Sequence, residues 1–153
     1  LVTISEEVGV GASAVLHGDV AEMLTLDNGT TAPGQNSSEF GVTICMADMS
    51  GPFDYHLTHR MLQICQEFEI PHQRDVFRYY RSDSAAAVEA GNDLRTALAS
   101  FGVDGSHGWE RFHWNALQSL AQLGALYMQS PPLYDRDRSG RGPLAGFPTM
   151  RGY

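Results

Sequence analysis

Basic residues are scarce in this 153-residue sequence. Lys and Arg together number 10, against 18 Asp and Glu, so the formal net charge is −8. The basic residues form no long patch. Because phosphate backbones attract clustered positive charge, we expect no nucleic-acid partner. The excess of carboxylates is compatible with cation binding, although it is also an ordinary means of keeping a protein soluble.

Long apolar runs are also absent. No stretch is long enough to cross a bilayer, and no basic segment followed by an apolar one marks a secretory leader. We therefore expect a cytoplasmic protein without a membrane partner. The chain begins directly in a strand-like segment, Leu1-Val2-Thr3-Ile4. This start suggests a fragment of a longer protein.

Cysteine is limited to Cys45 and Cys65, which form no CxxC pair. Both lie in apolar patterns, which favours buried free thiols in a reducing compartment. The sequence contains no HExxH, P-loop or GxSxG motif, so the hydrolase and nucleotide-binding classes that depend on them have no support.

Short apolar runs alternate with helical patterns, which predicts an α/β architecture. The 42% hydrophobic content suffices for one core, placed in residues 1–131, and residues 132–153 are expected to form a flexible tail. The predicted strands are Leu1–Ser5, Ala21–Leu26, Val42–Ala47, Arg74–Tyr79 and Thr96–Phe101. The predicted helices are Pro52–Glu69, Ser84–Ala90 and Trp109–Gln129, the first with a buried stripe of Leu57, Met61, Ile64, Cys65 and Phe68.

Two adjacent carboxylates, Glu6 and Glu7, follow the first predicted strand. Ligand sites in open α/β sheets gather at the carboxyl ends of strands. Adjacent carboxylates repel one another, and a site can use both if one binds a cation while the other takes a proton from water. The alternative is an exposed acidic pair in a turn. The local sequence alone leaves both interpretations open.

Asp27 and His107 also follow predicted strands. Asp27 begins an Asp-Asn-Gly sequence, which is ordinary turn chemistry as well, and a loop histidine such as His107 is often only a surface residue. Together with the Glu6–Glu7 pair, however, they supply O and N donors near one sheet edge. Such donors suit Zn²⁺, Co²⁺ or Mn²⁺.

Around these residues the sequence resembles a known family. Four motifs carry the resemblance: Thr3-Ile4-Ser5-Glu6-Glu7-Val8-Gly9, Leu26-Asp27-Asn28-Gly29, Arg81-Ser82-Asp83-Ser84-Ala85 and Ser106-His107-Gly108-Trp109-Glu110-Arg111. They resemble the di-zinc glutamyl-aminopeptidase/endoglucanase-like metallopeptidases, whose members form tetrahedral shells. The segments 51–59 and 74–80 look like one subgroup, the peptidase encoded with the N-acetylglutaminylglutamine amide osmoprotectant system.

The resemblance implies a partial domain with a three-layer, phosphorylase/hydrolase-like α/β sheet and flanking helices. It implies a metallo-aminopeptidase with two divalent ions, zinc or else cobalt or manganese. Glu6 matches the general base, Glu7 and His107 match ligands of one ion, and Asp27 matches a ligand of the other. Asp83 takes a supporting role. A peptide or modified dipeptide substrate and a homo-oligomer of the full-length protein are expected.

Two departures from the family pattern qualify this expectation. A histidine ligand and a bridging aspartate of the family lie upstream of the Glu-Glu motif, and nothing in this chain supplies them. The segment before the family's last histidine is replaced by Phe101-Gly102-Val103-Asp104-Gly105. The alternative prediction is therefore a truncated, non-catalytic fragment or interaction module.

Overall fold

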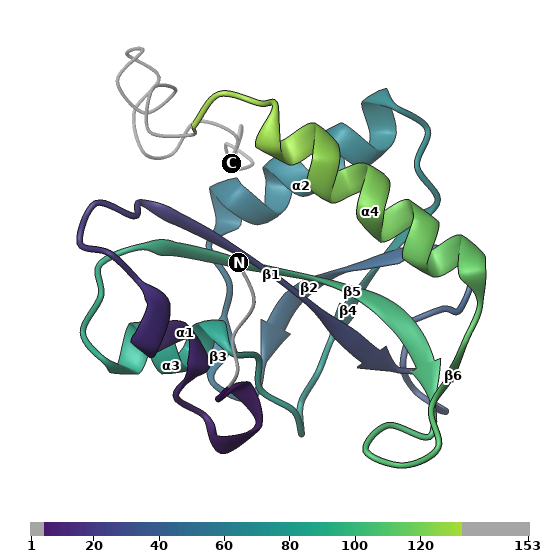
Figure 1. Cartoon of the computed structure of the whole chain (residues 1–153). Helices are drawn as coiled ribbons and strands as arrows, with labels where there is room; N and C mark the ends of the chain where they lie inside the picture. The colour runs from purple at the N-terminus through teal and green to yellow at the C-terminus, as the bar shows by residue number, and fades with distance from the viewer. Residues whose placement is uncertain (1–4, 133–153) are drawn as a thin grey trace, which may run out of the picture.

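A mixed six-stranded β-sheet organises residues 5–132, the part of the chain described by the structure, a computed structural model (Figure 1). The strands are β1 (Glu22–Thr30), β2 (Val42–Asp48), β3 (Gly51–Pro52), β4 (His72–Val76), β5 (Arg95–Asp104) and β6 (Arg111–Phe112). The helices are η1 (Glu6–Val8), α1 (Gly11–Val15), α2 (Tyr55–Glu67), α3 (Ser84–Glu89) and α4 (Trp114–Met128).

The four longer strands lie in the order β1-β5-β2-β4, and their directions are mixed. β1 pairs parallel with β5, β5 pairs antiparallel with β2, and β2 pairs parallel with β4. The short strands β3 and β6 extend β2 and β5 as antiparallel partners. The carboxyl ends of β1 and β5 therefore meet at one edge, while β2 and β4 end at the opposite edge.

Helices flank the sheet on both sides. Figure 1 shows α2 and α4 together above the sheet, and α1 and α3 together on its other side. This arrangement confirms the predicted α/β sheet with flanking helices. The first face carries the main core, in which α2 and α4 cover side chains of β2 and β5; its central members are Val42, Ile44, Leu57, Met61, Ile64, Cys65, Ala97, Ala99, Leu120 and Leu123.

The helix patterns gave the buried faces with two errors. In α2, the predicted stripe is buried from Leu57 to Cys65, but Phe68 is exposed because it follows the last helical turn. In α4, the helical spacing predicts a packed face of Leu117, Leu120, Ala121, Gly124 and Tyr127. Leu120 is buried as predicted, but Ala121 is exposed, and Leu123 lies in the core. α4 starts at Trp114 rather than Trp109, because His113 is its N-cap and the preceding residues form β6.

The ends of the strands differ from the predicted ends more than the positions of the strands differ from the predicted positions. β1 continues to Thr30, so Asp27 lies inside the strand rather than in a turn. β4 ends at Val76 rather than Tyr79, and β5 extends to Asp104 rather than Phe101. The predicted first strand, except Ser5, and residues 133–153 of the predicted tail lie outside the described residues.

Gly102 in β5 lies against the backbone of another segment. A Cβ at this position would stand 2.5 Å from the carbonyl carbon of Ser38 and 2.8 Å from the nitrogen of Glu39. Backbone atoms cannot move aside cheaply, so we expect Gly102→Ala to lower the free energy of unfolding by about 1–3 kcal/mol in urea titrations. Gly18→Ala is the control, because a Cβ there meets nothing within 4 Å. Equal effects of the two substitutions would contradict this prediction.

Candidate functional site

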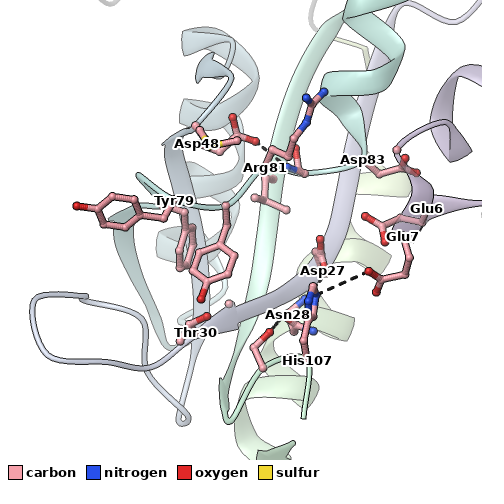
Figure 2. A pocket seen from close by; sticks show the side chains of 18 of the residues that line it. Glu6, Glu7, Asp27, Asn28, Thr30, Asp48, Tyr79, Arg81, Asp83 and His107 are labelled. Carbon is pink, nitrogen blue, oxygen red and sulfur yellow. Dashed lines mark hydrogen bonds and ion pairs between the residues drawn. The ribbon is translucent and has the colours of Figure 1, made fainter.

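A cavity of about 320 Å³ opens on the face of the sheet opposite α2 and α4. All five predicted site residues line it: Glu6, Glu7, Asp27, Asp83 and His107. They come from four segments that are distant in the sequence, and Figure 2 shows their side chains along one wall. The structure therefore brings together every residue that the sequence singled out.

Glu6 and Glu7 reach the cavity because the chain turns sharply there. They form the first two residues of the short helix η1, which ends at Gly9 with φ 75°. Glycine adopts this left-handed conformation without a steric penalty, and its N–H donates to the carbonyl oxygen of Glu6 at 2.7 Å. Two carboxylates are thereby presented in one turn at the mouth of the cavity.

His107 lies beside Glu7 on the cavity wall (Figure 2). Its Nε2 lies 3.7 Å from Oε2 of Glu7, and both side chains are largely exposed, so the contact adds little to stability. His107 has φ 60°, an unusual value outside glycine. The side chain of Glu110 accepts a hydrogen bond from the backbone N–H of His107 at 3.0 Å and supports this loop. Such strained residues cluster at functional sites.

Asp27 lies on the cavity face because of its place in β1. Leu24 packs against the main core on the first face, and side chains alternate along a strand, so Asp27 points to the second face. One of its oxygens accepts a hydrogen bond from the N–H of Asn28 at 2.7 Å. The sequence placed Asp27 beyond the strand end; the structure places it on the sheet itself.

Asp83 precedes α3 but does not cap it. No side-chain cap hydrogen bond forms there, and Oδ1 of Asp83 instead accepts from the N–H of Ala12 at 3.0 Å. Ala12 lies in α1, directly after the segment that carries Glu6 and Glu7. Asp83 therefore ties that segment to the start of α3.

Crowded carboxylates make the cavity electrostatically unfavourable for further negative charge. Burial is the largest cause of a raised pKa at Glu6, and the charges of Asp27, Glu7 and Asp83 add to it while the imidazole opposes it. Burial likewise raises the pKa of Asp27 most, with Glu7 and Asp83 adding to the rise and the Asn28 N–H opposing it. A bound proton or cation relieves this repulsion.

The donors fit a metal ion in kind. Tetrahedral bonds of about 2.0–2.2 Å place two donor atoms roughly 3.4 Å apart, close to the Glu7–His107 distance of 3.7 Å. Their number is insufficient, however. Among residues 5–132, no group of three or more His, Cys, Asp or Glu side chains is arranged to hold an ion. The described residues therefore supply a partial ligand set.

Sequence reasoning missed much of the cavity wall. Asp48 at the end of β2 and Met49 in the following turn line it, and Tyr79, Tyr80 and Arg81 line it from the segment before α3. The Tyr79–Arg81 segment stands directly before the Ser82-Asp83 motif, which was a usable signal. No signal pointed to Asp48, because only the sheet pairing brings the end of β2 to this cavity.

The raised pKa of Asp27 predicts a stability effect without metal. As pH rises, the unfolded chain releases this proton before the native state does, so ionisation of Asp27 lowers native stability above its folded pKa. We expect Asp27→Asn to raise the melting temperature at pH 7 in the presence of a chelator. The difference should vanish near pH 3, below the usual Asp pKa of about 3.9. A lower melting temperature at pH 7 would contradict this expectation.

Comparisons with known proteins agree with this geometry. YhfE of Bacillus subtilis (strain 168), assigned by inference as an aminopeptidase, is 36% identical to this chain over 131 residues. The match covers 86% of this chain and 38% of YhfE. The solved structure of aminopeptidase APDkam598 from the archaeon Desulfurococcus kamchatkensis matches with a TM-score of 0.75 at 22% identity, over 90% of this chain and 43% of that one.

The TET1 peptidase of Pyrococcus horikoshii, which can assemble into a tetrahedron or a large octahedral shell, matches with a TM-score of 0.64 at 21% identity, over 82% of this chain and 38% of that one. These structures share the fold of this chain, which spans less than half the length of each relative named here. The sequence pattern of the M42 glutamyl aminopeptidases matches residues 1–123. The chain therefore belongs to the M42 glutamyl aminopeptidase family.

Proposed function

We propose that this cavity is part of the catalytic site of a metal-dependent aminopeptidase-type hydrolase of peptide or amide bonds. One observation carries the proposal: a single cavity is lined by Glu6, Glu7, Asp27 and His107, which come from three separate segments. Membership of the M42 family supports it.

Glu6 is proposed as the group that moves the proton. Its carboxyl lines the cavity beside the proposed ion ligands, where it can accept a proton from the attacking water and later give it to the leaving amine. Glu7 and His107 would hold one divalent ion and Asp27 the other, with zinc the first candidate and cobalt or manganese the alternatives. When bound, the ions supply Lewis-acid polarisation of the scissile carbonyl.

The test is the release of amino acids from short peptides by this chain and by a longer protein that contains it. We expect activity that a chelator abolishes and added Zn²⁺, Co²⁺ or Mn²⁺ restores. A purified, folded longer protein that is inactive with every one of these ions would contradict the proposal. Retained activity in the chelator would contradict its metal dependence.

The second candidate function is a non-catalytic interaction module. The partial ligand set favours it for these 153 residues taken alone, since no group of three or more donors is arranged for an ion within residues 5–132. If the folded chain binds no zinc while a longer protein that contains it is active, catalysis belongs to the longer protein. A longer protein that is also inactive would favour the module.

A narrower substrate is also proposed: the osmoprotectant dipeptide N-acetylglutaminylglutamine amide, or a related modified dipeptide. The resemblance of segments 51–59 and 74–80 to the osmoprotectant-linked subgroup supports this choice. Parallel assays with the dipeptide amide and with unmodified peptides separate the two substrate classes. An enzyme that hydrolyses peptides but leaves the dipeptide amide intact would exclude the narrower substrate.

We further propose that the full-length protein is a homo-oligomer in the cytoplasm. The P. horikoshii relative, which assembles into closed shells, supports the first part. For the second, no helix among residues 5–132 is long and apolar enough to cross a membrane. Light scattering on the purified protein and cell fractionation test the two parts separately, and a monomer or a membrane-bound pool would contradict them.

A further inference from the structure

Asp48 is a buried carboxylate that the proposed chemistry does not use. It ends β2 and lines the cavity, yet it is only 7% exposed. Burying an ionised carboxylate is costly unless hydrogen bonds compensate it. The hydrogen-bond donors around Asp48 therefore indicate which segments this buried carboxylate holds in place.

Both oxygens of Asp48 accept hydrogen bonds from two different segments. Oδ1 accepts from the N–H of Ser50 at 2.8 Å and from the Ser50 hydroxyl, which closes the turn after β2. Oδ2 accepts from the N–H of Ser82 at 2.8 Å, across the cavity wall. Figure 2 shows this bond between Asp48 and the segment that carries Arg81 and Asp83. The neighbouring N–H of Met49 donates to the carbonyl of Tyr80 at 2.9 Å.

The contacts continue from Ser82 toward the segment that carries Glu6 and Glu7. Ser82 is 3% exposed, and the next residue, Asp83, accepts the hydrogen bond of the Ala12 N–H at 3.0 Å. Ala12 is itself 1% exposed and follows η1, which carries Glu6. A continuous path therefore runs from Asp48 through the start of α3 to the segment that presents Glu6 and Glu7.

We propose that Asp48 is a positioning residue, which holds the Glu6–Glu7 segment in place through Ser82, Asp83 and Ala12. A turn role alone explains the bonds to Ser50 but not the bond to Ser82. An amide keeps one acceptor oxygen and places an NH2 donor where the other oxygen stood, so Asp48→Asn cannot accept the backbone N–H bonds of both Ser50 and Ser82 in this geometry. The inference rests on the proposed function only for its effect on catalysis.

Asp75 provides a matched control. It is 8% exposed, and its Oδ2 accepts three N–H bonds, from Gln35, Asn36 and Ser37, which fasten the loop after β1 rather than the cavity wall. Asp75→Asn therefore removes the same charge with similar burial and bonding. Ser50→Ala is a second control, because it weakens the turn but leaves the bond from Asp48 to Ser82.

The first measurement is amide hydrogen exchange by NMR on the metal-free chain. Asp48→Asn should speed exchange of the Ala12 amide by roughly tenfold relative to the α2 amides, the effect of one weakened hydrogen bond. Asp75→Asn and Ser50→Ala should leave this ratio unchanged. A uniform rise across all amides, or an equal rise at Ala12 in Asp75→Asn, would overturn the proposal. Should Asp48→Asn not fold, Asp48→Glu, which keeps the charge but shifts it, must show the same selective effect.

The second measurement is hydrolysis by the longer protein. Asp48→Asn should lower kcat roughly tenfold with little change in KM, because the displaced group acts on the proton rather than on substrate binding. Asp75→Asn should leave both constants near wild type, and an equal fall of kcat there would overturn the catalytic part. If every form is inactive while Ala12 exchange responds as expected, the proposed function fails and the positioning path stands.

Discussion

Replacing Glu6 with Gln is expected to lower the rate of peptide-bond hydrolysis by about 10²–10⁴-fold, the usual contribution of a general acid–base group. Gln keeps the size of the side chain but cannot accept the proton. Stability should hold or rise slightly at pH 7, because burial and the neighbouring carboxylates already disfavour the ionised Glu6, whose pKa is raised. The measurements are kcat on a short peptide and the melting temperature.

Glu67→Gln is the matched control for this experiment. Glu67 is exposed in the last turn of α2 and lines none of the cavity, so the same change of charge there should leave kcat unchanged. A Glu6→Gln protein with near wild-type kcat would remove Glu6 from the proposed proton transfer. A large fall in melting temperature would instead indicate a structural role.

Replacing Glu7 with Ala is expected to weaken zinc binding more than the roughly 10–100-fold that loss of an outer-shell partner costs. Glu7 and His107 are the two donors with a spacing suited to one ion, and losing either leaves a single ligand. Isothermal titration calorimetry with Zn²⁺ on the chain measures the effect. Binding in the micromolar range or tighter that disappears in Glu7→Ala would show that the partial ligand set works.

Two further variants calibrate the zinc titration. Glu110→Ala removes the support of the His107 backbone without removing a donor, so a smaller loss is expected. Glu67→Ala should change nothing. Equally weak binding by wild type and Glu7→Ala would leave the isolated chain without a working metal site, and the catalytic proposal would then depend on the longer protein.

The fold was predictable where periodicity is strong. Leu57, Met61 and Ile64 recur at helical spacing, and they fill the core beneath α2 as expected. Element ends were less predictable, because they depend on partners distant in sequence. β6 forms by pairing with the end of β5, and α4 therefore begins at Trp114, after that strand.

The candidate site was predictable for a different reason. Glu6, Asp27 and His107 belong to short motifs that a resemblance can identify, and the structure gathers them at one cavity. Their chemical roles stay predictions. Asp48 could not have been found this way, since its importance arises from the hydrogen bond with Ser82, which is 34 residues away in the sequence, and no local pattern encodes that contact.

The position of Asp27 inside β1 constrains how this protein can change in length. Leu24 packs against the core that α2 and α4 cover, while Asp27, on the opposite face of the strand, lines the cavity. A one-residue insertion or deletion within β1 exchanges the two faces of the strand. Such a change would place a carboxylate under α4 and a leucine in the cavity at the same time. Length variation among natural variants should therefore spare β1 and collect in the connecting loops, such as residues 31–41.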